Sequence, residues 1–283
     1  MKNIITKLLV VVLIVATVFC FAGCGNSSSD ETITIAVPND STNEARALEL
    51  LAVNGLITLP EGTDTLATVR DIVENPHNIE FKEVEAAQIP NILQDVTYAV
   101  INSNYAIEAG LTPFTTEGTD VSYPNIIVVK EGNEQSDKTK ALVAAINSET
   151  VQAYINDTYK GAIVCDLENA GDGYDATVNY DALNGETISI ACSPTPHADI
   201  LKACQPILEA KGITLDIQEY NDYVVPNNIV EDGTVDANYF QHIPYLTNFN
   251  EENGTHLVSV LAVHHEPMGI YSDKYQDLGA FNN

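Results

Sequence analysis

The sequence contains few basic residues. It has 12 lysines and arginines against 40 aspartates and glutamates in 283 residues, and its formal net charge is −28. Only two residues, Arg46 and Arg70, are arginines. Nucleic acid is excluded as a partner, because phosphate binding needs clustered cations. We interpret nearly all of the acidic residues as a solvated surface.

The one long apolar run lies at the N-terminus. Residues 8–21 follow two lysines and have the length of a signal-peptide core, which is too short for a membrane span. Two small residues and then Cys24 come next, as at the lipidated cysteine of bacterial lipoproteins. We predict a signal peptide at 1–23, lipidation of Cys24 and a polar tether at 24–31, on the extracytoplasmic face of the cell membrane. The alternative is an ordinary secreted protein that carries a cysteine there.

Cysteine is also scarce in the rest of the chain. Cys165, Cys192 and Cys204 are an odd number and give no disulfide framework, and no metal-ligand spacing connects them. We interpret Cys192 and Cys204 as small core residues. No serine or cysteine nucleophile lies in a recognisable motif with its base, so we predict that the chain is not an enzyme and uses no cofactor.

Apolar segments of strand and helix character alternate along the chain, which predicts an α/β fold with mostly parallel sheets. Ser41 and Glu44 fit a capping box at the start of the first helix. Residues 239–249 are predicted to be helical. The acidic, glycine-containing segment 166–186 has no clear period and is predicted to be a linker.

Two blocks, residues 32–165 and 187–278, resemble the methionine-binding lipoproteins (the NlpA type), which are solute-binding components of ABC importers. In that family the two blocks come in the reverse order, so the chain resembles a circular permutant. The motifs that carry the resemblance are Pro38-Asn39-Asp40, Glu85-Ala86-Ala87-Gln88, Ala99-Val100-Ile101-Asn102, Tyr123-Pro124-Asn125, Asp236-Ala237-Asn238-Tyr239-Phe240-Gln241-His242 and Glu266-Pro267-Met268-Gly269.

The resemblance implies a two-lobed α/β fold like that of the type II periplasmic binding proteins, with a ligand cleft between the lobes. One lobe would be 32–102 and the other 103–283, which consists of 103–165, the linker 166–186 and 187–283. We expect the permutation to cut one of the two family connections between lobes. A single connection, somewhere between Val100 and Ile126, would then remain.

Arg46 is a candidate for holding a carboxylate, because a guanidinium grips carboxylates through two parallel hydrogen bonds. Spacing alone equally allows a surface arginine that pairs with Glu44 or Glu49, and the resemblance favours the ligand role. Asn102 and Asn125 could be turn residues. The resemblance implies that both bind the polar groups of an amino acid, to which amides can donate and accept.

The resemblance further implies that Tyr223, Phe240 and His242 line the pocket for the ligand side chain. Aromatic faces pack well against a thioether. Without the resemblance, the first two would be interpreted as core residues and His242 as a structural histidine.

His197 and His264-His265-Glu266 raise the question of a metal site. Adjacent histidines on a strand point to opposite faces, so both cannot easily bind one ion. We therefore predict no metal site.

The sequence predicts a lipid-anchored solute-binding protein that captures methionine or a close analogue and delivers it to an ABC permease with its ATPase. Two alternatives remain. A permuted duplicate that no longer binds amino acids would act as an interaction module. A surface hydrolase would show turnover.

Overall fold

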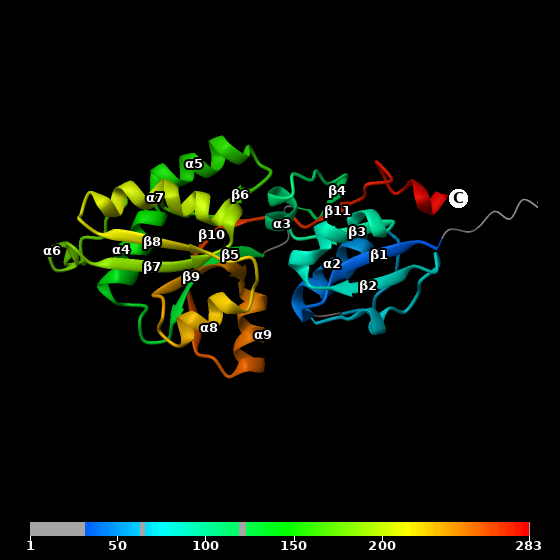
Figure 1. Cartoon of the computed structure of the whole chain (residues 1–283), viewed down its shortest axis with the longest axis horizontal. Helices are drawn as coiled ribbons and strands as arrows, with labels where there is room; N and C mark the ends of the chain where they lie inside the picture. The colour runs from blue at the N-terminus through cyan, green and yellow to red at the C-terminus, as the bar shows by residue number, and fades with distance from the viewer. Residues whose placement is uncertain (1–31, 63–65, 119–122, 283) are drawn as a thin grey trace, which may run out of the picture. The chain divides into compact units, whose positions relative to one another are not determined.

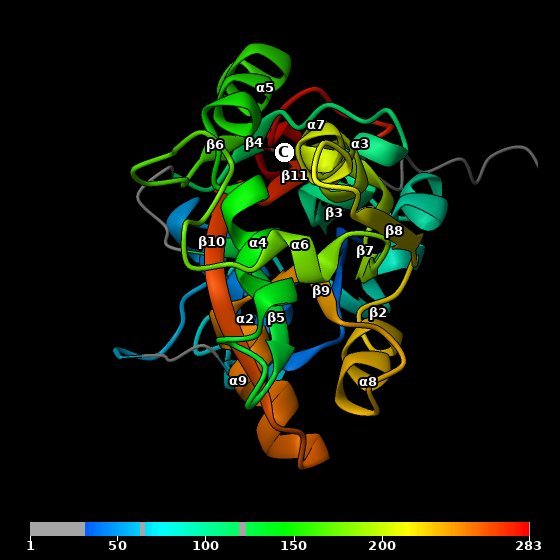
Figure 2. The ribbon, with the colours of Figure 1, turned by 90° about the vertical axis from the view of Figure 1, so that its left-hand side faces the viewer.

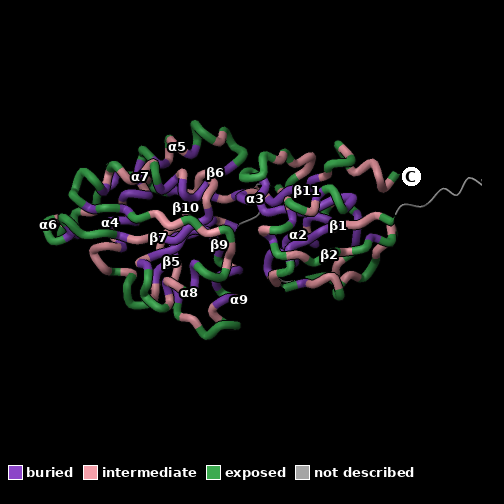
Figure 3. Tube along the Cα trace, viewed as in Figure 1, coloured by how far each residue is buried: buried purple, intermediate pink, exposed green. Residues whose placement is uncertain are grey.

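The computed structural model describes residues 32–62, 66–118 and 123–282, and the described residues from Ile33 onward form one unit. The predicted signal peptide, the tether and Cys24 lie outside the described residues. The unit that begins at Ile33 contains two β-sheets with helices packed on them (Figure 1). The buried residues gather along the strands of both sheets, and exposed residues lie on outer helices such as α5 (Figure 3).

The first sheet has five strands in the order β2-β1-β3-β11-β4. Helix α2 (Ser41–Val53) packs on one face, where Leu48 joins the cluster of Ile35 and Val100. The 3-10 helix η2 (Ala86–Asp95) and α3 (Ser103–Glu108) pack on the other. The strands are β1 (Thr34–Pro38), β2 (Glu80–Val84), β3 (Tyr98–Ile101), β4 (Thr115–Thr116) and β11 (Gly269–Tyr271).

The second sheet has six strands in the order β6-β10-β5-β9-β7-β8. Its strands are β5 (Pro124–Lys130), β6 (Val164–Cys165), β7 (Thr187–Cys192), β8 (Thr214–Glu219), β9 (Ala237–His242) and β10 (Leu257–His265). Side chains alternate between two apolar layers, with Ile127 and Val129 in one and Ile126 and Val128 in the other. Successive side chains of a strand point to opposite faces of the sheet, so this alternation is expected for a strand that is buried on both faces.

Helices cover both faces of the second sheet. Figures 1 and 2 show α5 and α7 on one side and α8 and α9 on the other. The first group comprises α4 (Asp137–Ile146), α5 (Glu149–Tyr159) and α7 (Asp199–Glu209), and the second comprises α8 (Val225–Glu231) and α9 (Ile243–Asn253). Cys192 and Cys204 are buried in the core under α7, as the sequence predicts.

Three predictions about local structure are wrong. The sheets are mixed rather than mostly parallel, because β11 and β4 pair antiparallel in the first sheet and β5, β10 and β6 do so in the second. Asp40, not Ser41, caps α2 by accepting a hydrogen bond from the Asn43 amide at 3.0 Å. Residues 237–242 form strand β9, and the helix begins only at Ile243.

The predicted boundary between lobes at residue 102 is also wrong. Strands β4 and β11 both belong to the first sheet, although they lie in the segment assigned to the other lobe. The chain therefore passes between the sheets twice, once between β4 and β5 and once between β10 and β11. Both connections are present where the sequence predicts one.

The two ends of the described unit pack on the same apolar cluster. Ile33 precedes β1, and Phe281 lies in the C-terminal 3-10 turn η4 (Gly279–Asn282). The Phe281 ring stacks on Tyr98 of β3, with centroids 5.3 Å apart and planes at 12°. The Tyr98 hydroxyl donates to the Asp277 carbonyl at 3.0 Å and accepts from the Ala280 amide at 3.1 Å. The C-terminal turn thus packs on a central strand of the first sheet.

Candidate functional site

All six residues predicted to bind ligand line one pocket, which contains about 350 Å³ of space and is partly open to solvent. Both sheets contribute to it. Helix α2 supplies Arg46, the end of β3 supplies Asn102, β5 supplies Asn125, and β9 supplies Phe240 and His242. Tyr223 comes from the segment between β8 and α8.

Arg46 is held from one side by a carboxylate that sequence reasoning missed. Its Nε donates to Glu117 Oε2 at 3.0 Å, and its Nη2 contacts Glu117 Oε1. Nη2 also donates to the Glu266 carbonyl at 2.7 Å, and the guanidinium carbon lies 4.4 Å from the centre of the Tyr123 ring. Among the described residues, the hydrogen bonds of the guanidinium use Nε and Nη2, which leaves the two Nη1 hydrogens to a ligand acceptor.

Neither alternative partner predicted for Arg46 takes part in these hydrogen bonds. The Glu44 carboxylate accepts from the Val69 amide at 2.8 Å. The closest carboxylate to the guanidinium belongs to Glu117, and both side chains are more than 90% buried. Buried opposite charges in this geometry must be paired, because a lone buried charge is strongly destabilising.

Two asparagines leave polar atoms free in the pocket. Asn102 Nδ2 donates to Asn43 Oδ1 at 2.8 Å, and Asn104 Oδ1 accepts from the Tyr223 hydroxyl at 2.8 Å. Within the part of the chain that the structure describes, Asn102 Oδ1 and Asn104 Nδ2 are buried without a hydrogen-bond partner. An unsatisfied buried polar group costs about 1–3 kcal/mol. A ligand that offers both a donor and an acceptor would remove this cost.

Aromatic rings form the apolar wall of the pocket. Tyr223 stacks on Phe240 with centroids 5.5 Å apart, and its ring also lies 5.1 Å from that of Tyr105. The Tyr245 hydroxyl donates to the Tyr223 carbonyl at 3.1 Å and so fixes the segment before α8. Burial raises the pKa of Tyr223 well above its ordinary value, which keeps the hydroxyl a neutral donor to Asn104.

His242 is neutral in this wall. Its Nδ1 accepts from the Tyr245 amide at 3.2 Å, so the ring hydrogen is on Nε2, which lies 3.3 Å from Asn43 Oδ1. Burial, and secondarily the charge of Arg46, lower the pKa of His242 to about 3. The groups that face the ring are Asn43, Tyr123, Tyr245 and Arg46.

This lowered pKa predicts a loss of stability in mild acid. Below the ordinary histidine pKa of about 6.5, the unfolded chain takes up a proton that the folded chain does not. The contribution of His242 to the free energy of unfolding is therefore intact above about pH 6.5 and is lost as pH falls toward 3. Between pH 7.5 and 5.5 we expect a loss of about 1.4 kcal/mol, measured by urea unfolding.

His242→Gln should remove that pH-dependent part, whereas His256→Gln should retain it because His256 is exposed. An equal pH dependence in His242→Gln and the wild type would contradict the assignment.

Several pocket residues were not predicted: Asn43, Ser103, Asn104, Gln241, Tyr245 and Glu266. Asn43 lies one helical turn before Arg46, and this spacing could have indicated it because such residues share a helix face. Glu117 pairs with Arg46 across 71 residues of sequence, and nothing in the local pattern indicates that contact.

Two mixed β-sheets with helices on their faces jointly line one pocket, and its lining includes amides, aromatic rings and a single arginine. This arrangement defines the class of protein as a two-sheet α/β binding protein. The sequence profile of the NlpA lipoprotein family matches residues 28–166 and 188–283. The chain therefore belongs to the NlpA lipoprotein family, whose members are substrate-binding lipoproteins rather than enzymes.

Known proteins match parts of the chain. Membrane lipoprotein TpN32 of Treponema pallidum (strain Nichols) is 42% identical over 134 residues, which are 46% of this chain and 50% of that protein. The D-methionine-binding lipoprotein MetQ of Escherichia coli (strain K12) is 42% identical over 136 residues, with the same two shares. The chain thus spans about half the length of the curated relatives it matches.

A solved structure with similar coverage is that of a nutrient binding protein from Burkholderia cenocepacia bound to methionine. It is 40% identical, covers 47% of this chain and 60% of its own, and has a TM-score of 0.44. In the present structure, none of the described helices is both apolar enough and long enough to cross a bilayer.

Proposed function

We propose that this chain is a lipid-anchored, extracytoplasmic solute-binding protein that captures methionine or a close analogue for an ABC importer. The observation that carries the proposal is the pocket itself. It combines the Nη1 edge of Arg46, an aromatic wall and two buried amide atoms that have no partner among the described residues, an acceptor on Asn102 and a donor on Asn104. These groups match a zwitterion with an apolar side chain.

Each part of the amino acid has a proposed partner. The ligand carboxylate binds Arg46 Nη1, where a charge-assisted hydrogen bond can form. The ammonium donates to Asn102 Oδ1, and Asn104 Nδ2 and Asn125 complete the polar contacts. The thioether packs on Tyr223, Phe240 and His242, with contacts of about 0.3–1.5 kcal/mol each. Methionine binding by the E. coli and B. cenocepacia relatives supports this choice of ligand.

Calorimetric titration of the purified protein tests the function. We expect saturable binding of one L- or D-methionine per chain and weaker binding of aspartate, because a second carboxylate would be desolvated against the aromatic wall. Absence of heat and of any thermal shift at millimolar methionine would overturn the proposal. That result would favour the alternative of an interaction module.

The anchor and the transporter are parts of the same proposal. Acyl chains on Cys24 would hold the protein at the membrane surface, close to an ABC permease and its ATPase. The membrane lipoproteins among the relatives support this placement. Cys24→Ala should release the protein from the membrane fraction of cells, and retention of that variant would count against lipidation.

We also propose that the chain is a circular permutant of the family. The two profile segments flank residues 167–187, and both ends of the described unit pack on one cluster. Because β4 and β11 belong to the first sheet, we propose that the cut lies within that sheet rather than in a connection between the two sheets. A chain reordered as 187–282 followed by 32–165, with a short linker, should fold and bind the same ligand. A reordered chain that is soluble only as an unfolded species would contradict the permutation.

A further inference from the structure

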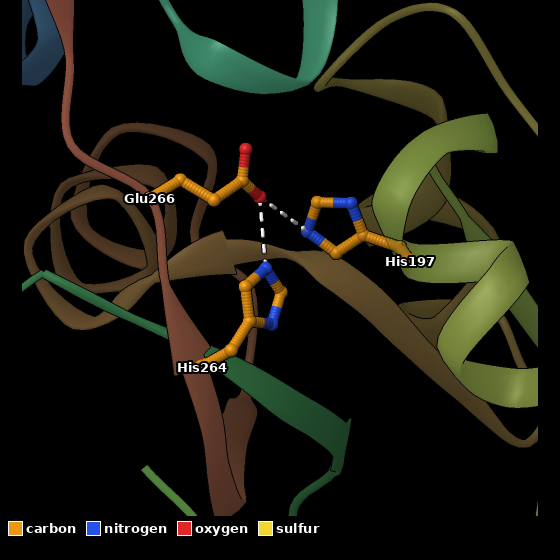
Figure 4. Close-up of side chains that lie close together, drawn as sticks. All are labelled: His197, His264 and Glu266. Carbon is orange, nitrogen blue, oxygen red and sulfur yellow. Dashed lines mark hydrogen bonds and ion pairs between the residues drawn. The ribbon is translucent and has the colours of Figure 1, made fainter. Parts of the chain in front are cut away.

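Two histidines and a glutamate converge beside the pocket. His197 lies in the helical turn η3 (Pro194–Ala198) before α7, His264 is near the end of β10, and Glu266 follows that strand. Figure 4 shows the three side chains pointing toward one another. Glu266 Oε1 lies 2.9 Å from His264 Nε2 and 3.6 Å from His197 Nε2. All three side chains are buried.

A fourth potential ligand atom lies beside these three. Asn125 Oδ1 is 2.9 Å from His197 Nε2. Asn125 pairs directly with His264 in the ladder between β5 and β10, so the sheet register fixes it next to the cluster. Four potential ligand atoms therefore come from two adjacent strands, the segment after one of them, and the turn before a helix.

We propose that His197, His264 and Glu266 bind a divalent transition-metal cation such as Zn²⁺, with Asn125 Oδ1 as an additional oxygen ligand. Two imidazole nitrogens and one carboxylate form a ligand set that suits Zn²⁺. Bonds of about 2.0–2.1 Å in a tetrahedral site put the ligand atoms about 3.3 Å apart. The separations of 2.9 and 3.6 Å bracket that value, and all three ligand atoms lie within 4.8 Å of one another.

The hydrogen bonds of His264 are compatible with metal binding. Without metal, His264 Nε2 donates to Glu266 while the Tyr239 hydroxyl contacts Nδ1. When a cation takes Nε2, the ring hydrogen moves to Nδ1 and faces the Tyr239 oxygen, an outer partner of the kind that metal-bound histidines have.

The ring of His197 can also change tautomer. Its Nε2 donates to Asn125 Oδ1 at 2.9 Å, and among the described residues its Nδ1 has no hydrogen-bond partner. When a cation takes Nε2, the ring hydrogen moves to Nδ1, where no protein acceptor among the described residues competes for it. The prediction of no metal site considered the adjacent pair His264 and His265. These do diverge, since His265 Nδ1 lies 2.9 Å from Asp166 Oδ1, away from the cluster. Glu266, just after the strand, instead brings its Oε1 to 2.9 Å from His264 Nε2.

The test uses the untagged protein, stripped of metal with a chelator and titrated with Zn²⁺ by calorimetry and with Co²⁺ by visible absorption. We expect one cation per chain and Co²⁺ bands typical of a four- or five-coordinate site. His197→Gln and His264→Gln should weaken Zn²⁺ binding at least about 100-fold, since each removes one of few ligands. Glu266→Gln retains an oxygen acceptor for His264 and should weaken binding about 10-fold or more.

His265→Gln and His256→Gln are the matched controls and should bind Zn²⁺ as the wild type does. The chain is strongly acidic, so weak binding at several surface sites must be separated from the cluster. Absence of Co²⁺ bands in the wild type would show a hydrogen-bonded network only and would overturn the proposal, whether or not the variants fold. Binding that survives in a folded His264→Gln would overturn it equally. Methionine titration of the stripped protein separates this outcome from the proposed function.

Discussion

Replacing Arg46 with methionine is expected to weaken methionine binding at least about 100-fold, or about 2.7 kcal/mol, because the carboxylate loses its charged partner. The single variant leaves Glu117 buried without its cation, which would confuse a loss of affinity with a loss of folding. The double variant Arg46→Met/Glu117→Gln removes both charges and preserves most of the packing. Calorimetry on the double variant is therefore the decisive measurement.

The other arginine provides the control. Arg70 lies in the 3-10 turn η1 (Val69–Asp71), outside the pocket. Arg70→Met should leave the methionine affinity within about twofold, since screened charges outside the pocket contribute little. If the folded double variant binds methionine within threefold of the wild type, Arg46 does not hold the carboxylate.

Glu117→Ala is expected to lower the free energy of unfolding by about 3–5 kcal/mol, because it leaves the Arg46 guanidinium buried and unpaired. The Arg46 side chain is only 7% exposed, so solvent does little to replace the lost carboxylate. Urea unfolding in the absence of ligand measures the effect. Saturating methionine should recover part of the loss, because the ligand carboxylate supplies a new partner for the same charge.

A surface ion pair shows what the burial contributes. Glu219 pairs with Lys202 at 3.3 Å, with side chains 44% and 53% exposed. Glu219→Ala should cost about 1 kcal/mol or less. Adding Glu117→Ala to Arg46→Met should cost far less than the single change does, since the buried charge is then absent. A Glu117→Ala variant within 1 kcal/mol of the wild type would contradict the proposed coupling.

The six predicted pocket residues could be named from sequence because family motifs carry them, and the structure places all six at one pocket. Their charge partners could not be named. Glu117 reaches Arg46, and His197 reaches Asn125, only after distant segments have packed. Local patterns carry no information about such pairs.

Strand assignments failed where sheet neighbours decide the structure. Residues 239–242 run directly into a helix, and their pattern suits either element, but pairing with β5 and β7 makes them a strand. Residues 268–271 are predicted to be a strand, and β11 confirms this, but nothing in its three residues indicates which sheet it joins. Its pairing with β3 nevertheless brings the chain back to the first sheet. The local sequence pattern could not predict this second connection between the sheets.

The contacts of Tyr98 have a consequence for fluctuations near the C-terminus. Chain ends normally fray at little cost in free energy and exchange their amide hydrogens quickly. Here the Ala280 amide is bound to a hydroxyl whose ring is part of a central strand, and Phe281 stacks on that ring. If the last residues open, the Tyr98 ring in the first sheet loses the contacts that cover it. We therefore expect the C-terminal turn to open together with β3, so that protection of the Ala280 amide from exchange would report on the stability of that sheet.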